Sequence, residues 1–170
     1  MNLLLAIALF SGLDLYFVKD SPNLIVRIVP EVMANQITLL YSYKAADWDT
    51  MSLLVNDRFI DAVLAPPESL KVIGLYYLYD NGTRDDNKGK LYLYEIKRSP
   101  RFLMPFSVAD LETMLASAKK KILSGTHADE GMALVDYILE VAPLVPYLPG
   151  TEQETKITIL QSEAAELKKQ

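Results

Sequence analysis

Short stretches of apolar and alternating residues dominate the first part of the chain. Residues 13–18 (LDLYFV), 24–29 (LIVRIV) and 37–43 (ITLLYSY) are rich in leucine, isoleucine, valine and tyrosine. Branched and aromatic side chains suit a pleated, half-buried surface, and a Ser-Pro turn separates the first two stretches. The pattern therefore predicts three early strands.

The densest apolar pattern lies at residues 71–98. Two runs, 72–79 (VIGLYYLY) and 91–96 (LYLYEI), flank the polar segment 80–90, which holds an Asn-Gly pair and many charges. This pattern predicts a hairpin at the centre of a sheet, because both faces of both runs are apolar. If Asp80 pairs with Lys90, Glu95 lies opposite Leu75.

The hydrophobic period changes after the third predicted strand. Apolar residues then recur at steps of three and four, which is the spacing of one helix face. They are Trp48, Met51, Val55, Phe59 and Ala62. A Pro-Pro pair follows and would end the helix. The spacing predicts a helix over about 47–64.

Two further helices are predicted in the second half. Ser107 and Asp110 form an approximate capping box, and Gly125 is a typical C-cap, so one helix covers about 107–124. The other covers about 129–142 and ends at a proline. Residues 99–106 (SPRFLMPF) read as a proline-bounded connector.

Strands first and helices later predict an α+β fold with an antiparallel or mixed sheet. In this fold the tyrosine-rich hairpin (about 71–98) is central, and helices at about 47–64, 107–124 and 129–142 pack on it. We expect residues 1–150 to form a single domain. Residues 151–170 are expected to be a polar tail or short helix, with a charged helix from residue 162.

The chain has 170 residues, and none of them is cysteine. That excludes disulfides and thiolate metal sites, and favours a cytoplasmic protein. The apolar run 3–10 (LLLAIALF) is too short to span a bilayer and lacks a preceding cation and a cleavage site. We interpret it as a buried first element, with an interaction surface or a signal remnant as alternatives.

The charge is distributed unevenly along the chain. The net charge is −5, yet residues 84–121 carry nine Lys and Arg against five Asp and Glu. This basic segment could face an acidic partner such as nucleic acid. We favour the interpretation that these charges lie on a solvated helix face and turn. Nucleic-acid binding is the alternative.

Glu95 and Lys97 are the residues with the clearest chemical potential. Two positions apart on a strand, they point to the same face. With Ile96 between them they resemble the E-x-K half of the PD-(D/E)xK nuclease family. That resemblance implies a divalent metal held by paired carboxylates, and a lysine that activates water. No acid lies opposite Glu95 on the hairpin, so a carboxylate of the predicted helix, Asp57 or Asp61, would have to complete the set.

The hairpin tyrosines have two interpretations. They can pair across the strands in the core, or they can form a contact surface with their polar tips. The candidate binding surface consists of Tyr76, Tyr92, Tyr94, Arg98 and Arg101.

No complete catalytic set can be recognised in the sequence. It has no phosphate-binding glycine loop and no paired His or Cys ligands, so we expect no metal and no cofactor. The sequence favours a non-catalytic protein-interaction or assembly module, including a homo-oligomer. The metal-dependent nuclease with Glu95, Lys97 and Asp61 is the alternative, and a small-ligand pocket between sheet and helices is a third option.

Overall fold

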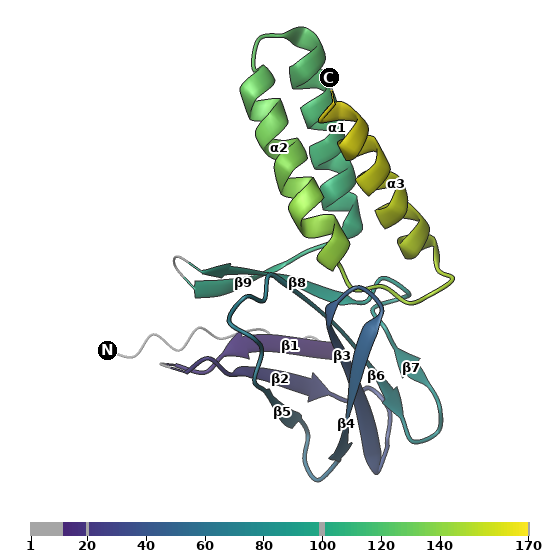
Figure 1. Cartoon of the computed structure of the whole chain (residues 1–170). Coiled ribbons are helices and arrows are strands. Elements are labelled where there is room, and N and C mark those ends of the chain that lie inside the picture. The colour runs from purple at the N-terminus through teal and green to yellow at the C-terminus, as the bar shows by residue number, and fades with distance from the viewer. Residues whose placement is uncertain (1–11, 20, 99–100, 170) are drawn as a thin grey trace.

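The computed structural model describes residues 12–19, 21–98 and 101–169, and these residues form nine strands, three α-helices and one short 3-10 helix (Figure 1). The strands are β1 (Gly12–Phe17), β2 (Leu24–Val29), β3 (Gln36–Lys44), β4 (Asp47–Leu54), β5 (Ile60–Leu64), β6 (Val72–Tyr79), β7 (Arg84–Asp85), β8 (Tyr92–Arg98) and β9 (Arg101–Pro105). The helices are α1 (Val108–Ser124), α2 (Ala128–Val141), η1 (Ala142–Leu144) and α3 (Glu152–Leu167). The apolar run 3–10 lies outside the described residues.

The strands form two antiparallel sheets. The smaller sheet has the order β1-β2-β5, and the larger has the order β4-β3-β6-β8-β9 with β7 paired to β6. One core lies between the two sheets, and a second lies between the larger sheet and the helices. The larger sheet is therefore the middle layer, with the helices on its far side from β1, β2 and β5 (Figure 1). The predicted α+β class with helices packed on an antiparallel sheet is confirmed.

Strand β6 buries both of its faces, as a strand in a middle layer must. Ile73, Leu75 and Tyr77 belong to the core between the sheets. Val72 and Tyr76 belong to the core under the helices. The prediction that the tyrosine-rich hairpin is central is confirmed, since β6 lies between β3 and β8.

The predicted helix at 47–64 is wrong, because the segment forms β4, a turn and β5. In β5 the buried residues Ile60, Ala62 and Leu64 alternate with exposed positions, which is the period of a strand. The apolar residues at helical spacing are divided between the two strands and the turn: Trp48 and Met51 lie in β4, Ala62 lies in β5, and Val55 and Phe59 lie between the strands. Asp57 and Asp61 consequently lie in a turn and on a strand rather than on a helix.

The predicted register of the hairpin is also wrong. Val72, not Leu75, lies opposite Glu95. The segment 80–90 is more than one turn: the chain first folds back so that β7 pairs with the end of β6, and only then continues to β8. The register moves by three residues. An odd shift transfers every side chain to the other face of the sheet, so Glu95 points toward the helices instead of the space between the sheets.

The second half of the chain departs less from prediction. The capping box at Ser107 and Asp110 is present, and Gly125 ends α1 with a φ of 68°. The predicted connector 99–106 contains strand β9. The tail beyond residue 150 forms α3 from Glu152 onward, not only from residue 162, and it packs against α1 and α2.

Candidate functional site

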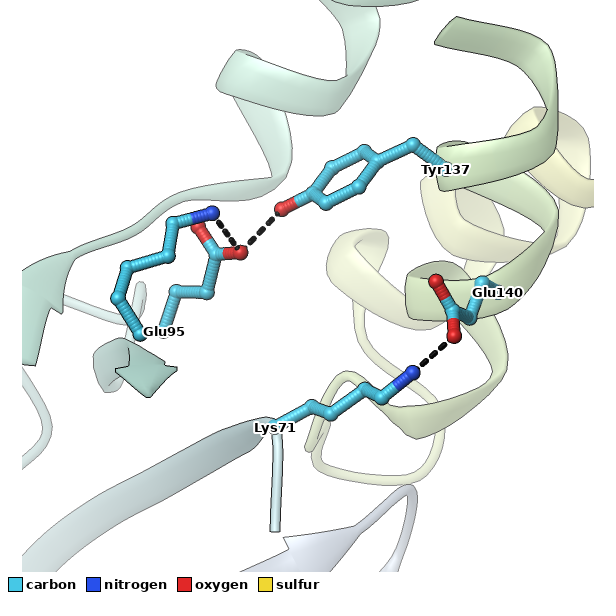
Figure 2. A network of polar contacts seen from close by, with 5 residues as sticks. Lys71, Glu95, Tyr137 and Glu140 are labelled. Atoms are coloured by element: carbon cyan, nitrogen blue, oxygen red, sulfur yellow. Dashed lines mark hydrogen bonds and ion pairs between the residues drawn. The ribbon is translucent and has the colours of Figure 1, made fainter. Parts of the chain in front are cut away.

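Glu95 lies in a polar network where the larger sheet meets helix α2 (Figure 2). Its side chain is buried, with 6% of the residue exposed. The carboxylate forms an ion pair with Lys97 and accepts a hydrogen bond of 2.7 Å from the Tyr137 hydroxyl. The Lys97 ammonium also lies 5.5 Å from the centre of the Tyr137 ring. Glu95, Lys97 and Tyr137 therefore each have a polar or charged partner within this cluster.

Three elements position the network. Alternation along β8 places Glu95 and Lys97 on the helix-facing side of the sheet. Tyr137 reaches them from α2. Glu140, one turn further along α2, forms an ion pair with Lys71, the residue just before β6 (Figure 2). The polar contacts therefore fasten the middle of β8 and the start of β6 to one helix.

The surroundings of Tyr137 keep it a hydrogen-bond donor. Burial raises the pKa of its hydroxyl, and the hydrogen bond to Glu95 raises it further. The proton therefore stays on Tyr137 across the physiological range and satisfies the buried carboxylate. This arrangement supports a stable junction between sheet and helix.

The structure does not bring Asp61 to Glu95. Asp61 lies on the smaller sheet, where its two oxygens accept hydrogen bonds of 2.8 and 2.7 Å from Arg27. Glu95 lies beyond the core between the sheets, on the opposite face of the larger sheet. No group of three His, Cys, Asp or Glu side chains that could hold a metal occurs among the described residues.

The three tyrosines of the predicted binding surface do not share one face. Tyr76 is buried under the helices, and its ring meets Trp48 edge-on with centres 5.0 Å apart. Tyr92 and Tyr94 lie on the other face of the sheet, where their hydroxyls bond to Asp85 (2.8 Å) and to the Leu13 carbonyl (3.3 Å).

The two arginines of that predicted surface face each other across the β8–β9 hairpin. The backbones of Arg98 and Arg101 pair at its end. Their side chains lie outside what the structure describes.

The burial of tyrosines in β3 and β8 has a consequence at high pH. Burial raises the pKa of Tyr94 to about 12, with a contribution from Asp14, and burial also raises the pKa of Tyr43 to about 12. An unfolded tyrosine has a pKa of about 10. The unfolded chain therefore loses protons between pH 10 and 12 while the folded chain keeps them, and stability falls as the pH rises through this window.

We expect the urea midpoint to be level up to pH 10 and to decline from there to pH 12. Circular dichroism measured across this range tests it. Tyr94→Phe, which removes one ionisable group, should make the decline shallower. A midpoint that is unchanged at pH 12 would contradict the prediction.

The basic segment 84–121 is partly neutralised in the fold. Arg84 pairs with Asp86, and Lys97 pairs with Glu95. Two lysines of α1 pair with acids of the other helices, in the ion pairs Lys119–Glu163 and Lys121–Glu130. Four of the nine cations of this segment are therefore engaged by acidic side chains.

The smaller sheet carries a surface that the sequence analysis missed. On its face away from the larger sheet, Tyr16, Ile25 and Val63 form one row across the three strands. Val63 is 53% exposed, and the neighbouring Phe59 is 44% exposed. Alternation within residues 60–64 was the signal that could have revealed this face, but the helical spacing of the larger apolar residues masked it.

A charged row lies beside this apolar row. Asp14, Arg27 and Asp61 align across the three strands. The Arg27 guanidinium lies over the ring of Phe59, 4.2 Å from its centre, and 5.6 Å from the ring centre of Tyr16. The hydrogen bond with Asp61 raises the pKa of Arg27. We define the outer face as Asp14, Tyr16, Ile25, Arg27, Phe59, Asp61 and Val63.

In the part of the chain that the structure describes, no helix is both long enough and apolar enough to cross a membrane. The chain matches no model of a known protein family, and no curated protein matches it significantly in sequence.

Proposed function

We propose that the protein is a non-catalytic assembly module, and that two copies associate through the outer face. The main observation is the exposure of Phe59 and Val63 around the fixed Arg27 side chain. Exposed aromatic and aliphatic side chains next to an ordered arginine are typical of interface centres.

The charges of the outer face are compatible with a twofold dimer. We consider a twofold axis that lies in the interface, runs parallel to the strands and passes between β2 and β5. Rotation about this axis would place each cross-strand row of one copy against the same row of the partner copy, in reversed order. Arg27 would then face the partner's Asp61, and Ile25 would face the partner's Val63. No like charges would meet at the centre, which is a condition for a self-complementary interface.

The size of this face limits the affinity. Three strands of five or six residues cover an area about 20 Å long and about 15 Å wide. Such an area, about 300 Å² on each copy, is smaller than a standard specific interface, so we expect weak, reversible association with a dissociation constant in the high micromolar range.

The other functions predicted from the sequence have less support. The nuclease alternative needs a second carboxylate beside Glu95, and Asp61 is engaged by Arg27 on the smaller sheet. Nucleic-acid binding has less support because four of the nine cations of the basic segment are paired with acidic side chains. A different protein partner on the same face, and a cytoplasmic location, remain predictions.

Val63→Lys tests the proposed dimer. We expect the unchanged chain to increase in weight-average mass with concentration in sedimentation equilibrium. The variant should weaken association by about tenfold or more, because it buries an ammonium group against apolar side chains.

Leu123→Lys is the matched control. Leu123 is largely exposed on α1, far from the outer face, so this variant introduces the same charge without touching the proposed interface. An unchanged chain that stays monomeric at every concentration, or an equal loss of association in both variants, would contradict the proposal.

A further inference from the structure

A cavity of about 520 Å³ opens at one end of the two sheets. It lies between the β2–β3 loop (residues 30–35), part of the β4–β5 loop (residues 55–58) and Asp80, which follows β6. Its volume is within the range of ordinary ligand sites. The Glu95 network and the charged row of the outer face contribute no residue to it.

Backbone hydrogen bonds fix the walls of this cavity. The Glu31 N–H donates to the Tyr79 hydroxyl (3.0 Å), and the Asn35 N–H donates to the Asp80 carboxylate (2.9 Å). The Val55 N–H donates to the Asn35 carbonyl and joins the two loops (3.0 Å). A ligand would therefore meet a preformed wall and would not have to order these loops on binding.

The fixed β2–β3 loop displays two apolar side chains at the rim. Met33 is fully exposed, and Val32 is 42% exposed. Both residues line the cavity. Folding gains nothing from an ordered methionine in water, whereas a thioether on a rigid loop is well suited to contact varied apolar side chains of a partner.

The cavity is acidic as well as apolar. Among its described lining residues, Glu31, Asp57 and Asp80 are acidic and Arg58 is the single cation. One oxygen of Asp80 is engaged by the Asn35 N–H, and no ion pair of Glu31 or Asp57 occurs among the described residues. A positively charged group with an apolar neighbour complements this lining, whereas phosphate groups would be repelled.

We infer that this cavity binds a peptide segment of a partner protein in which lysine or arginine stands beside an apolar side chain. The cation would lie near Glu31 and Asp57, and the apolar side chain would contact Met33 and Val32. This site is separate from the proposed dimer face and would serve a different partner.

Fluorescence anisotropy with labelled heptapeptides tests the inference. The probe has the sequence Gly-Leu-Lys-Gly-Leu-Lys-Gly, and two matched peptides replace its lysines by glutamate or its leucines by serine. We expect saturable binding of the first probe at low ionic strength, about 0.01 M, where charges act over about 30 Å. Both matched peptides should bind at least about tenfold more weakly.

Variants of the residues that line the cavity test which side chains contact the peptide. The double variant Glu31→Gln with Asp57→Asn should weaken binding about fivefold and reduce its dependence on salt, and Met33→Ser should weaken it about threefold. The matched control is Asp129→Asn with Glu166→Gln, which removes two exposed carboxylates of α2 and α3, and it should change binding less than twofold.

Three outcomes of the peptide-binding experiments would overturn the inference. They are no saturable binding of the lysine peptide, equal binding of the lysine and glutamate peptides, and equal effects of the lining and control variants. Association of Met33 with phosphatidylcholine vesicles in place of the peptide would also overturn it, since it would identify the apolar rim as a lipid contact. Circular dichroism of every variant establishes that the fold is intact.

Discussion

Gly74→Ala is expected to lower the free energy of unfolding by about 3 kcal/mol. Gly74 lies in β6, where the middle layer meets the segment between α2 and α3. A Cβ atom at this position would lie 2.5 and 2.9 Å from the Cβ and Cγ atoms of Pro146, and 3.0 Å from Leu93 Cδ2. Pro146 and Leu93 are both buried, and a proline ring cannot rotate away. The clash therefore outweighs the small gain that alanine normally brings to a strand.

Urea denaturation of the unchanged chain and of the Gly74→Ala variant measures this difference in the free energy of unfolding. Ser52→Ala on the exposed side of β4 is a matched control and should change stability by less than about 0.5 kcal/mol. Pro146→Gly in the Gly74→Ala background should recover part of the loss, because it removes the nearest atoms. A loss below about 0.5 kcal/mol for Gly74→Ala would show that the helices can move away from the sheet at no cost.

The hydrophobic period and the residues typical of turns were sufficient to predict several elements of this fold. The bounds 24–29 and 72–79 agree with β2 and β6, since apolar runs between polar turns have few other conformations available. The caps of α1 were equally local signals, because Ser107, Asp110 and Gly125 act on the backbone of their own helix.

The errors arose where local signals conflict with tertiary structure. Residues 47–64 satisfy a helical period, but β3 and β2 offer edges to which β4 and β5 pair. Pairing and burial between the sheets override the weak helical preference. The hairpin register failed for a related reason: β7 pairs within the loop, and this pairing cannot be read from its composition.

The candidate site shows the same difference between what local sequence signals predict and what tertiary structure determines. That Glu95 and Lys97 share a face follows from alternation alone. Their partner Tyr137 lies 42 positions from Glu95 in the chain, and only the packing of α2 on the sheet places it there. Asp61 was proposed as a partner from the predicted helix, and it bonds to Arg27 because β2 and β5 are neighbours.

Lys97→Met is expected to destabilise the fold by about 2 kcal/mol, because among the described side chains it leaves Tyr137 as the remaining charge-stabilising partner of the buried Glu95 carboxylate. Breaking a fully buried ion pair typically costs about 3–5 kcal/mol. The smaller value applies here since 37% of the Lys97 side chain is exposed, so water can reach part of the pair. Methionine keeps the apolar stem of lysine, and the packing against Tyr137 is therefore largely retained.

Adding Glu95→Gln to Lys97→Met separates charge from packing. The amide oxygen can still accept the hydrogen bond of the Tyr137 hydroxyl, while the uncompensated charge disappears. If the buried charge causes the loss, the double variant should regain more than half of the stability lost by Lys97→Met in urea denaturation. If the double variant is as unstable as Lys97→Met alone, the loss comes from packing, and the network does not hold the sheet to α2 through its charges.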